Sequence, residues 1–185
     1  MKVYVVRHGE SQTNRAMCYT GYFDSPLTDK GREDAKFARE VLGNIKFDMI
    51  FASDLGRAVE TCMIATGCEP KTDALLREID VGRLENTPFE NLSREERTKH
   101  FKIGYAQFGG ESKEDFRLRI KSFMNKLESL DCDNVAVFSH GAWLISMLCM
   151  VLDVDSLSNI LCANCAVGVF DYSDGKWMLH SLINK

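Results

Sequence analysis

The chain has 185 residues, of which 45% are hydrophobic and 27% charged, and its formal net charge is -4. This balance is typical of a folded globular protein, whereas a disordered chain has fewer apolar residues and a more one-sided charge. Without a basic block, the chain is also a poor candidate for binding nucleic acid, because such binding needs clustered cations that neutralise phosphates. We therefore expect a single domain over residues 1–185.

Apolar periodicity and turn residues predict short strands that alternate with helices. In chain order, the predicted elements are a strand over residues 2–6, a helix over 30–43, a strand over 47–52, a helix that Gly67 ends, an extended piece over 73–79, a helix over 112–130, a strand over 135–138, a helix over 141–152, and a hairpin of 166–172 with 176–183. Ser53 or Asp54 is expected to cap the helix that follows the second strand. This order predicts an α/β fold, a three-layer α/β/α sandwich with a mostly parallel central sheet.

Residues 83–109 form the longest stretch without clear periodicity, and they include charged and aromatic residues. Segments of this kind often form binding loops, so we expect a small cap over the functional site. Its aromatic residues are Phe89, Phe101, Tyr105 and Phe108. Two interpretations stay open: with Tyr22 and Phe23 these side chains form an apolar wall for a ligand, or they pack the segment onto the core.

The sequence favours a cytoplasmic protein with no membrane partner. No apolar run approaches the length of a membrane span, and the apolar run after Lys2 is too short for a signal peptide. The seven cysteines agree, because an odd number in a chain of this size indicates free thiols. Cys162 and Cys165 form a lone C-x2-C pair, which we interpret as two buried small residues rather than a zinc or redox site.

Residues suited to catalysis cluster directly after the predicted strands. In chain order they are Arg7-His8-Gly9 after the first strand, Arg57 in the first turn of the helix after the second, Glu78 after the extended piece, and His140-Gly141 after the strand at 135–138. In α/β sheets ligands bind beyond the carboxyl ends of the strands, so we expect these side chains to meet at one edge. The glycine after each histidine leaves room there for a ligand or for another stretch of backbone.

Two arginines, two histidines and one glutamate suit phosphoryl transfer through a phosphohistidine. Arginine forks bind phosphate oxygens in pairs, and a neutral histidine nitrogen can attack phosphorus. A second histidine can stabilise the charge that develops on the phosphate, and a protonated carboxyl can donate to the leaving oxygen. This chemistry uses no metal ion and no cofactor, and the partner it predicts is a small-molecule phosphate ester.

The same residues admit other interpretations. His8 and His140 could bind a metal ion together with a carboxylate, although the two arginines would then repel the cation. Arg57 could form only a surface salt bridge with Asp54 or Glu60. A phosphate-binding module without catalytic activity is the alternative from a different class of protein. The presence of all the arginines, histidines and the glutamate that phosphoryl transfer would use argues against this alternative.

Several short motifs follow one another in a fixed order. They are Val6-Arg7-His8-Gly9-Glu10-Ser11 with Asn14, Thr20-Gly21, Asp24-Ser25-Pro26-Leu27-Thr28, Gly31, Ser53-Asp54-Leu55, Arg57-Ala58, Glu60-Thr61, Arg77-Glu78-Ile79, Gly82, Gly109-Gly110-Glu111-Ser112 and Ser139-His140-Gly141. This ordered set covers most of residues 2–165 and resembles the signature of the histidine phosphatase superfamily, the phosphoglycerate mutase-like family. The resemblance implies the same α/β/α fold and a metal-independent enzyme that works through a phosphohistidine.

The resemblance also implies a role for each matched residue. His8 would be the phosphorylated nucleophile and Glu78 the proton donor, while Glu10, close to Gly9, is the rival donor. The remaining roles would be phosphate binding by Arg7, Asn14, Arg57 and His140, lining of the pocket by Ser11, Thr20 and Gly21, and room for the backbone to approach the phosphate at Gly141.

Two positions depart from the family pattern. Thr20 stands where many phosphatases of the family have glutamine, and a threonine there resembles the mutases. After Gly82 the chain reads Arg83-Leu84-Glu85-Asn86, without the tryptophan and glycine that the family often has, so the local turn is expected to differ.

Within the family we expect a hydrolase of phosphomonoesters, and a phosphoglycerate mutase is the alternative. Mutases that resemble this family are longer, with inserted segments that close over the phosphohistidine and exclude water. Family members with similar core residues act on sugar phosphates, on nucleotide-derived phosphates such as α-ribazole phosphate, and on phosphorylated proteins. The natural substrate therefore stays open. The oligomeric state stays open as well.

Overall fold

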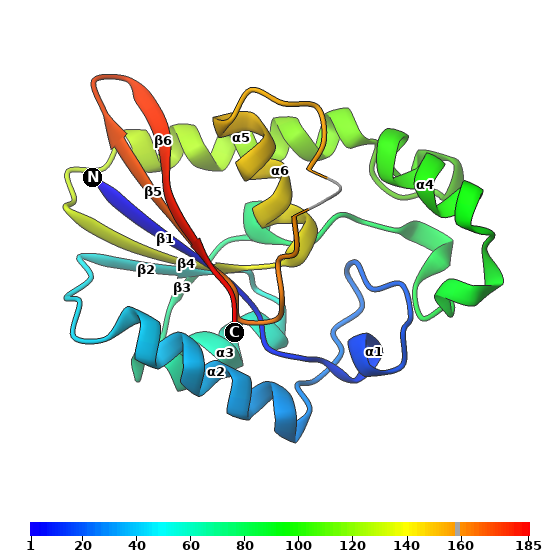
Figure 1. Ribbon diagram of the computed structural model, residues 1–185, viewed down its shortest axis with the longest axis horizontal. Helices are drawn as coiled ribbons and strands as arrows, with labels where there is room; N and C mark the ends of the chain where they lie inside the picture. Colours follow the sequence, from blue (N-terminus) through cyan, green and yellow to red (C-terminus); the bar gives the residue numbers. More distant parts are fainter. Residues whose placement is uncertain (158–159) are drawn as a thin grey trace.

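The computed structural model describes residues 1–157 and 160–185 (Figure 1). Its strands are β1 (Lys2–Arg7), β2 (Met49–Ala52), β3 (Lys71–Thr72), β4 (Asn134–Ser139), β5 (Val167–Ser173) and β6 (Lys176–Ile183). Its helices are α1 (Gln12–Arg15), α2 (Asp29–Leu42), α3 (Gly56–Thr66), α4 (Arg94–Ile103), α5 (Lys113–Glu128) and α6 (Gly141–Val151). Short 3-10 turns lie at η1 (Ala74–Leu76), η2 (Gly82–Leu84), η3 (Phe89–Asn91) and η4 (Ala106–Phe108).

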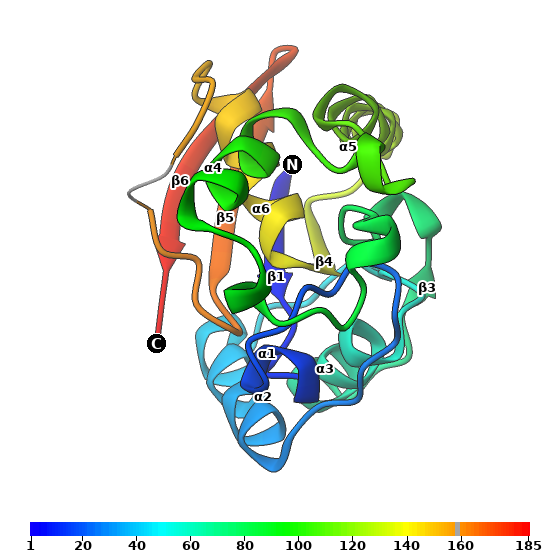
Figure 2. The same ribbon diagram turned by 90° about the vertical axis from the view of Figure 1, so that its right-hand side faces the viewer.

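The strands form one sheet in the order β3-β2-β4-β1-β5-β6. The first four of these run parallel to one another, whereas β5 and β6 add antiparallel strands at one edge. Helices α2 and α3 cover one face of the sheet, and α5 and α6 cover the other (Figure 1). The predicted α/β class, with three layers around a mostly parallel sheet, is therefore confirmed. Figure 2 shows the molecule from the side at which the carboxyl ends of the parallel strands lie.

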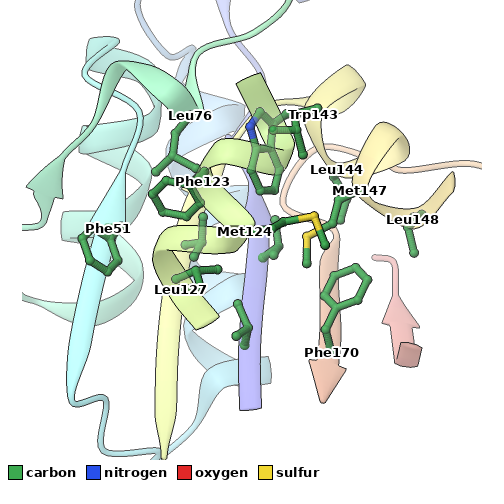
Figure 3. Packing of buried hydrophobic residues seen from close by; sticks show 14 of the residues in the cluster. Phe51, Leu76, Phe123, Met124, Leu127, Trp143, Leu144, Met147, Leu148 and Phe170 are labelled. Carbon is green, nitrogen blue, oxygen red and sulfur yellow. The ribbon is translucent and has the colours of Figure 1, made fainter. Parts of the chain in front are cut away.

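Alternation along the central strands divides their side chains between two apolar cores. Val3 and Val5 of β1 pack with α5 and α6, whereas Val6 packs with α2 and α3. Figure 3 shows the first core, where the rings of Phe123 and Trp143 lie 6.0 Å apart. Burial of side chains this large stabilises the fold by roughly 1.5–3 kcal/mol each. Packing on both faces fixes β1 and β4, so the residues that follow these strands have fixed positions as well.

Several predicted elements lie within one or two residues of their expected bounds. The amphipathic helix expected over 112–130 is α5, and the expected inner face is buried at Phe116, Ile120, Phe123, Met124 and Leu127. The hairpin is β5 and β6, and its turn residues Asp174 and Gly175 both have positive φ, at 50° and 73°. This left-handed backbone matches the twist of the paired strands, which is why an Asp-Gly pair is a strong hairpin signal.

Two local predictions are wrong. The piece expected to be extended over 73–79 contains no strand. β3 ends at Thr72, and the Asp73 side chain then accepts a hydrogen bond from the Leu75 backbone N–H at 2.9 Å and starts the turn η1. Neither Ser53 nor Asp54 caps α3, whose N-cap is Leu55 without a side-chain bond. Asp54 instead pairs with Arg77 at 2.6 Å.

The segment over 83–109 is less irregular than its sequence indicates, because it contains helix α4. This helix has no apolar stripe, so periodicity does not show it. A capping box begins it: the Ser93 hydroxyl accepts from the Glu96 backbone N–H, and the Glu96 carboxylate accepts from the Ser93 backbone N–H at 2.8 Å. The pair Ser93-x-x-Glu96 was the signal in the sequence that could have located the helix.

The two ends of this segment touch. A Cβ on Gly82 would lie 2.3 Å from the Phe108 carbonyl oxygen, and one on Gly110 would lie 2.2 Å from the Asp80 carbonyl oxygen. The Glu111 backbone N–H donates to the same Asp80 oxygen at 2.9 Å. Only glycine leaves enough space for two backbones this close, so these positions fix where the segment leaves the core and where it returns.

The described helices include none that is long and apolar enough to cross a bilayer. All seven cysteines lie in the described ranges and are free thiols. Cys162 and Cys165 are 3% and 0% exposed, which confirms their interpretation as buried residues. Burial raises the pKa of the Cys165 thiol to about 12, so this sulfur is a poor nucleophile.

Candidate active site

The end of β1 and the end of β4 lie side by side and bring the two histidines together. Arg7 pairs with Ser139 in the parallel register, and the His8 backbone N–H donates to the Ser139 carbonyl oxygen at 2.9 Å. The rings of His8 and His140 therefore face each other, with centroids 5.0 Å apart and planes at 64°. This proximity depends on strand order, because 132 residues of sequence separate the two histidines (140 − 8 = 132).

The orientation of His8 leaves one ring nitrogen free for chemistry. Its Nδ1 lies 2.7 Å from the Gly9 carbonyl oxygen. A carbonyl can only accept, so Nδ1 carries the proton and Nε2 keeps its lone pair. Burial, followed by the charges of Arg57 and Arg7, lowers the pKa of His8 well below its ordinary value. His8 is therefore neutral near pH 7, the form that a nucleophile requires.

The glycine after His8 makes room for the start of α2. A Cβ on Gly9 would lie 2.3 Å from the Gly31 carbonyl oxygen, and one on Gly31 would lie 2.1 Å from the Glu10 carbonyl oxygen. The Gly9 backbone N–H also donates to the Thr61 hydroxyl of α3 at 3.0 Å. Three elements thus meet at the turn after β1, and they hold His8 in place.

Arg57 is buried in the first turn of α3, with 1% of its surface exposed. Its guanidinium donates to the carbonyl oxygens of Phe23 at 2.7 Å and Gly21 at 2.8 Å. The surface salt bridge considered from the sequence is absent from the described residues, because Glu60 pairs with Arg32 at 2.6 Å and Asp54 pairs with Arg77. Arg57 therefore places its charge inside the molecule.

Arg7 and Gly141 lie against each other. A Cβ on Gly141 would lie 3.2 Å from the Nε atom of Arg7, so the absence of a side chain lets the guanidinium lie close to the start of α6. Gly141 therefore makes room for the Arg7 guanidinium, in addition to the role toward a phosphate that the family resemblance implies. The Arg7 Nη1 group donates to the Cys162 carbonyl oxygen and so ties β1 to the chain before β5.

Glu78 is held by two backbone N–H groups. Its carboxylate accepts from Ile79 at 2.9 Å and from Ala142, in the first turn of α6, at 3.1 Å. Burial raises the pKa of Glu78 above its ordinary value, in spite of these bonds and of the nearby charges of Arg57 and Arg7. A larger fraction of Glu78 is thus protonated near neutral pH than for an exposed glutamate, as a proton donor requires.

Glu10, the rival donor, is engaged elsewhere. Its carboxylate accepts from the Thr28 hydroxyl at 2.8 Å and lies 3.8 Å from the Lys30 ammonium group. Both partners belong to the start of α2. The structure thus ties Glu10 to the outside of the site and Glu78 to its interior.

Asn14 is held through its amide oxygen. Its amide oxygen accepts from the Ser11 backbone N–H at 3.2 Å and from the Asn164 side chain at 3.3 Å, which leaves the NH₂ group free to donate. Asn164 also donates to the His8 carbonyl oxygen at 3.1 Å. Asn164 was missed from the sequence, because it stands in a stretch without periodicity and touches the site only through the fold.

Three residues expected to line the pocket have structural contacts instead. Ser11 is fully buried and caps α1 by accepting from the Asn14 backbone N–H at 3.3 Å. The Thr20 hydroxyl donates to the Cys18 carbonyl oxygen at 3.3 Å. The Gly21 carbonyl oxygen accepts a hydrogen bond from Arg57, so Gly21 helps to position this arginine.

Glu85 organises the loop that holds Arg57. Its carboxylate accepts from the backbone N–H groups of Gly21, Tyr22 and Phe23, at 3.1, 2.6 and 3.1 Å. The carbonyl oxygens on the other side of this loop bind Arg57. Asn86, next in the chain, has a φ of 61° and so adopts the left-handed conformation where the family often has glycine. An asparagine thus occupies a left-handed position in this turn.

Four buried nitrogen atoms of the site have no hydrogen-bond partner among the described residues. They are Nε of Arg7, Nε of Arg57, and both ring nitrogens of His140. Burial, followed by the charge of Arg57, also lowers the pKa of His140 well below its ordinary value. Unpaired buried polar atoms are rare in folded proteins, and here all four belong to residues whose charge or ring lies near His8. An oxyanion would satisfy them.

A metal ion would find no comparable partners. Across residues 1–157 and 160–185, no group of three or more histidine, cysteine, aspartate or glutamate side chains could hold one. The alternative with His8, His140 and a carboxylate as ligands therefore has no geometric support. The site fits an anion through its two arginines.

The aromatic residues of the segment over 83–109 pack mainly against one another and against Tyr19. The ring of Phe89 lies 4.7 Å from that of Tyr19, and the ring of Phe108 lies 4.9 Å from that of His100. Tyr105 lies 6.1 Å from Tyr19. The side chain of Phe101 lies outside the described part of the structure. These contacts favour the packing interpretation for Phe89 and Phe108, whereas Tyr105 also lines a small cavity with Ile79 and Ala142.

Comparison with known proteins identifies relatives over nearly the whole chain. A model of the histidine phosphatase superfamily (branch 1) matches residues 3–185. The curated "probable phosphoglycerate mutase GpmB" of Enterobacter sp. (strain 638) is 31% identical over 189 residues, which cover 96% of this chain and 88% of that protein.

Solved structures show the same similarity. The phosphoglycerate mutase from Bacillus anthracis str. Sterne superposes with a TM-score of 0.87 at 27% identity, over 98% of this chain and 92% of that one. The protein TTHB049 from Thermus thermophilus superposes with a TM-score of 0.81 at 29% identity, over 99% of both chains. Every residue of the site described above lies within the matched range of the superfamily model.

Proposed function

Because this chain belongs to the histidine phosphatase superfamily (branch 1), whose members are enzymes, we propose that it is a phosphomonoester hydrolase acting through a phosphohistidine at His8. The observation that carries the proposal is the opposite shift of two neighbouring groups. Burial and two arginines lower the pKa of His8, while burial raises that of Glu78. Both shifts favour the neutral form of the group, an unprotonated ring nitrogen on His8 and a protonated carboxyl on Glu78, and these are the forms that a nucleophile and a proton donor require.

In the first step, Arg7, Arg57 and His140 bind the phosphate, and the Asn14 NH₂ group donates to it. The lone pair on His8 Nε2 forms a bond to phosphorus while the bond from phosphorus to the ester oxygen breaks. The Glu78 carboxyl gives its proton to the departing oxygen, which leaves as an alcohol. The unpaired nitrogens of the site support this binding mode, since the Nε atoms of Arg7 and Arg57 and one ring nitrogen of neutral His140 can donate to an oxyanion.

In the second step, water attacks the phosphohistidine. The Glu78 carboxylate accepts a proton from the water as its oxygen bonds to phosphorus. The nitrogen–phosphorus bond breaks and its electron pair returns to His8 Nε2. Inorganic phosphate leaves, and Glu78 is protonated again for the next cycle.

The alcohol part of the substrate would extend toward a small cavity beside Glu78. Ile79 and Ala142, whose backbone N–H groups hold the Glu78 carboxylate, also line this cavity. Its walls include Tyr105, Phe116 and Ile145, and it has room for about 70 Å³. Such a space accepts a few carbon atoms, so we expect a small phosphorylated metabolite as the substrate.

A phosphoglycerate mutase is the second candidate, and the names of the relatives favour it. The relatives named as mutases are matched over 88% and 92% of their own lengths, so a chain of this size is compatible with that name. We favour hydrolysis because the aromatic side chains of the segment over 83–109 are used to pack that segment. A mutase must keep water from the phosphohistidine long enough to return the phosphoryl group to substrate.

Product analysis separates the two candidates. The purified protein is incubated with 3-phosphoglycerate, and in parallel with a panel of small phosphate esters, and the products are followed by phosphorus NMR. A hydrolase releases inorganic phosphate from one or more esters and forms little 2-phosphoglycerate. Efficient interconversion of the two phosphoglycerates without phosphate release would replace the hydrolase by the mutase. Absence of either reaction across the panel would favour a non-catalytic phosphate-binding module.

Activity is expected to survive chelation. The positive charge that stabilises the transferring phosphoryl group comes from Arg7, Arg57 and the donors of His140, so no divalent ion is needed for that task. Hydrolysis of an aryl phosphate should therefore keep its rate after incubation with excess EDTA and removal of the chelator. A loss of activity that one added metal restores would show that this electrostatic account is wrong.

The segment over 83–109 is expected to contribute to stability more than to substrate choice. Replacing Phe89 with alanine removes its packing on Tyr19 and should lower the free energy of unfolding by about 2 kcal/mol. Because the change acts through packing, kcat/KM for aryl and alkyl esters should fall by the same factor. Phe23, 45% exposed, is the matched control, and its replacement by alanine should leave the melting temperature unchanged. A KM rise confined to aryl esters in the Phe89 variant would support the ligand-wall interpretation.

A further inference from the structure

The side chain of Arg119, on α5, uses every N–H group of its guanidinium. The Nε and Nη2 atoms donate to the two carboxylate oxygens of Glu111, at 2.8 and 2.7 Å. The remaining N–H groups donate to the carbonyl oxygens of Leu75, Arg77 and Glu78, at 3.0, 2.8 and 3.0 Å. Arg119 and Glu111 are only 13% and 18% exposed, so this ion pair is largely removed from solvent.

These bonds hold the backbone on both sides of Glu78. Arg119 binds the carbonyl oxygens of Arg77 and Glu78, and Glu111 accepts from the Asp80 backbone N–H at 2.9 Å. Leu75 has a second anchor, because its carbonyl oxygen also accepts from the Trp143 indole at 3.1 Å. For the Arg77 and Glu78 carbonyls, Arg119 is the sole hydrogen-bond donor within the described ranges. The backbone at Arg77 and Glu78 is therefore held by this one guanidinium, while the Ala142 backbone N–H holds the Glu78 carboxylate.

We infer that Arg119, held by Glu111, is a positioning residue that sets Glu78 for proton donation. The inference rests on the proposed function, since it assumes that Glu78 is the acid. Arg119 binds the Glu78 backbone and not its carboxylate, so it acts on where the acid lies. A planar guanidinium can bind three carbonyls and a carboxylate at once, whereas a lysine ammonium has three donors and no fork.

The inference predicts a selective defect rather than a general one. Aryl phosphates have good leaving groups and need little protonation, whereas alkyl phosphates depend on the acid. Replacing Arg119 with lysine should lower kcat/KM for an alkyl phosphate by about 10²-fold, the scale of a misplacement near 1 Å. For an aryl phosphate the decrease should be about threefold or less, because His8, Arg7 and Arg57 make no contact with this side chain.

Arg97 supplies a matched control. It also binds backbone carbonyls with its guanidinium, those of Phe89 and Leu92 at 2.8 and 3.1 Å, but it does so in the segment over 83–109. Arg97→Lys should change kcat/KM for the two esters by the same small factor. A melting curve for each variant separates a loss of folded protein from a loss of positioning.

A double-mutant cycle with Glu78→Gln decides the matter. If Arg119 acts through the Glu78 proton, Arg119→Lys should produce no further loss on the alkyl ester once the proton is gone. A full additional loss in the double variant, or equal slowing of both esters in the single one, would overturn the inference. If Arg119→Lys does not fold, Glu111→Gln weakens the same pair while the guanidinium stays, and the same two outcomes apply to it.

Failure of the proposed function is recognised separately. A wild-type protein that hydrolyses neither ester would refute the hydrolase, and a Glu78→Gln variant that slows both esters equally would remove Glu78 from the acid role. The wild-type protein and the Glu78→Gln variant are therefore assayed before any Arg119 variant. With both of them as expected, an unselective Arg119 variant counts only against the positioning role.

Discussion

Replacing His8 with alanine is expected to lower kcat/KM for phosphate esters by about 10⁴–10⁶-fold, the range seen when an enzyme loses its nucleophile. The arginines, His140 and Glu78 remain in the variant, but in the proposed mechanism they bind the phosphate oxygens or transfer the proton, and His8 alone attacks phosphorus. The fold should survive, because His8 contributes a single side-chain bond, to the Gly9 carbonyl oxygen, and packs at the end of a strand that both cores fix.

The covalent intermediate gives an independent measurement. A phosphohistidine is a phosphoramidate, stable in alkali and labile in acid, so rapid quenching at alkaline pH should trap a phosphorylated wild-type protein. The His8→Ala variant should carry no label. His180 is a suitable control, because its exposed ring pairs with Asp171 at 3.2 Å on the far sheet edge, and His180→Ala should keep both activity and label. Near-native activity in the His8 variant would refute the mechanism.

Replacing Glu78 with glutamine is expected to lower kcat/KM for alkyl phosphates by about 10²–10⁴-fold, the usual contribution of a general acid. Aryl phosphates should be slowed by about tenfold or less, because a phenolate leaves without full protonation. Glutamine keeps the shape and can still accept from Ile79 or Ala142, so the variant tests the proton more than the packing.

The pH dependence of the wild-type protein and of the Glu78→Gln variant tests whether Glu78 is the acid. Since burial raises the pKa of Glu78, the wild-type protein keeps its acid protonated further toward neutral pH, and alkyl-ester hydrolysis should fall as pH rises through that pKa. This alkaline decrease should disappear in Glu78→Gln. Glu10→Gln is the matched control, because its carboxylate binds Thr28 and Lys30 outside the site. If Glu10→Gln shows the selective defect and Glu78→Gln does not, the two carboxylates must exchange roles.

The sequence predicts the core of the fold because its signals there are local and agree with one another. The apolar runs of β1 and β4, the periodic apolar face of α5, and the Asp-Gly turn of the hairpin each encode an element within a few residues. The rule that ligands bind beyond parallel strand ends then brings His8, Arg57 and His140 to one edge. The structure places these three side chains together, and no further information is needed for that step.

Contacts made through the fold could not be predicted in this way. Asn164 reaches Asn14 and His8 across about 150 residues of sequence, and Arg119 reaches the carbonyls beside Glu78 across about 40. Most of the partners are backbone carbonyl oxygens, which every residue has, so residue types carry no sign of these contacts. The contact of Gly141 with the Arg7 side chain also joins residues that are far apart in the sequence, and only the fold brings them together. Helix α4 was not predicted, because it has no apolar stripe and its only signal in the sequence is the capping box at its start.

The meeting of Gly82 with Gly110 bears on how this protein could diverge. A segment that leaves and returns at one point can be lengthened, shortened or exchanged with little disturbance to the rest of the chain, because the ends keep their spacing. His8, Arg57, Glu78 and His140 all stand outside that segment, on the frame that stays. The segment can therefore diverge apart from these four residues, provided that Glu85 is kept, since its carboxylate holds the loop that binds Arg57.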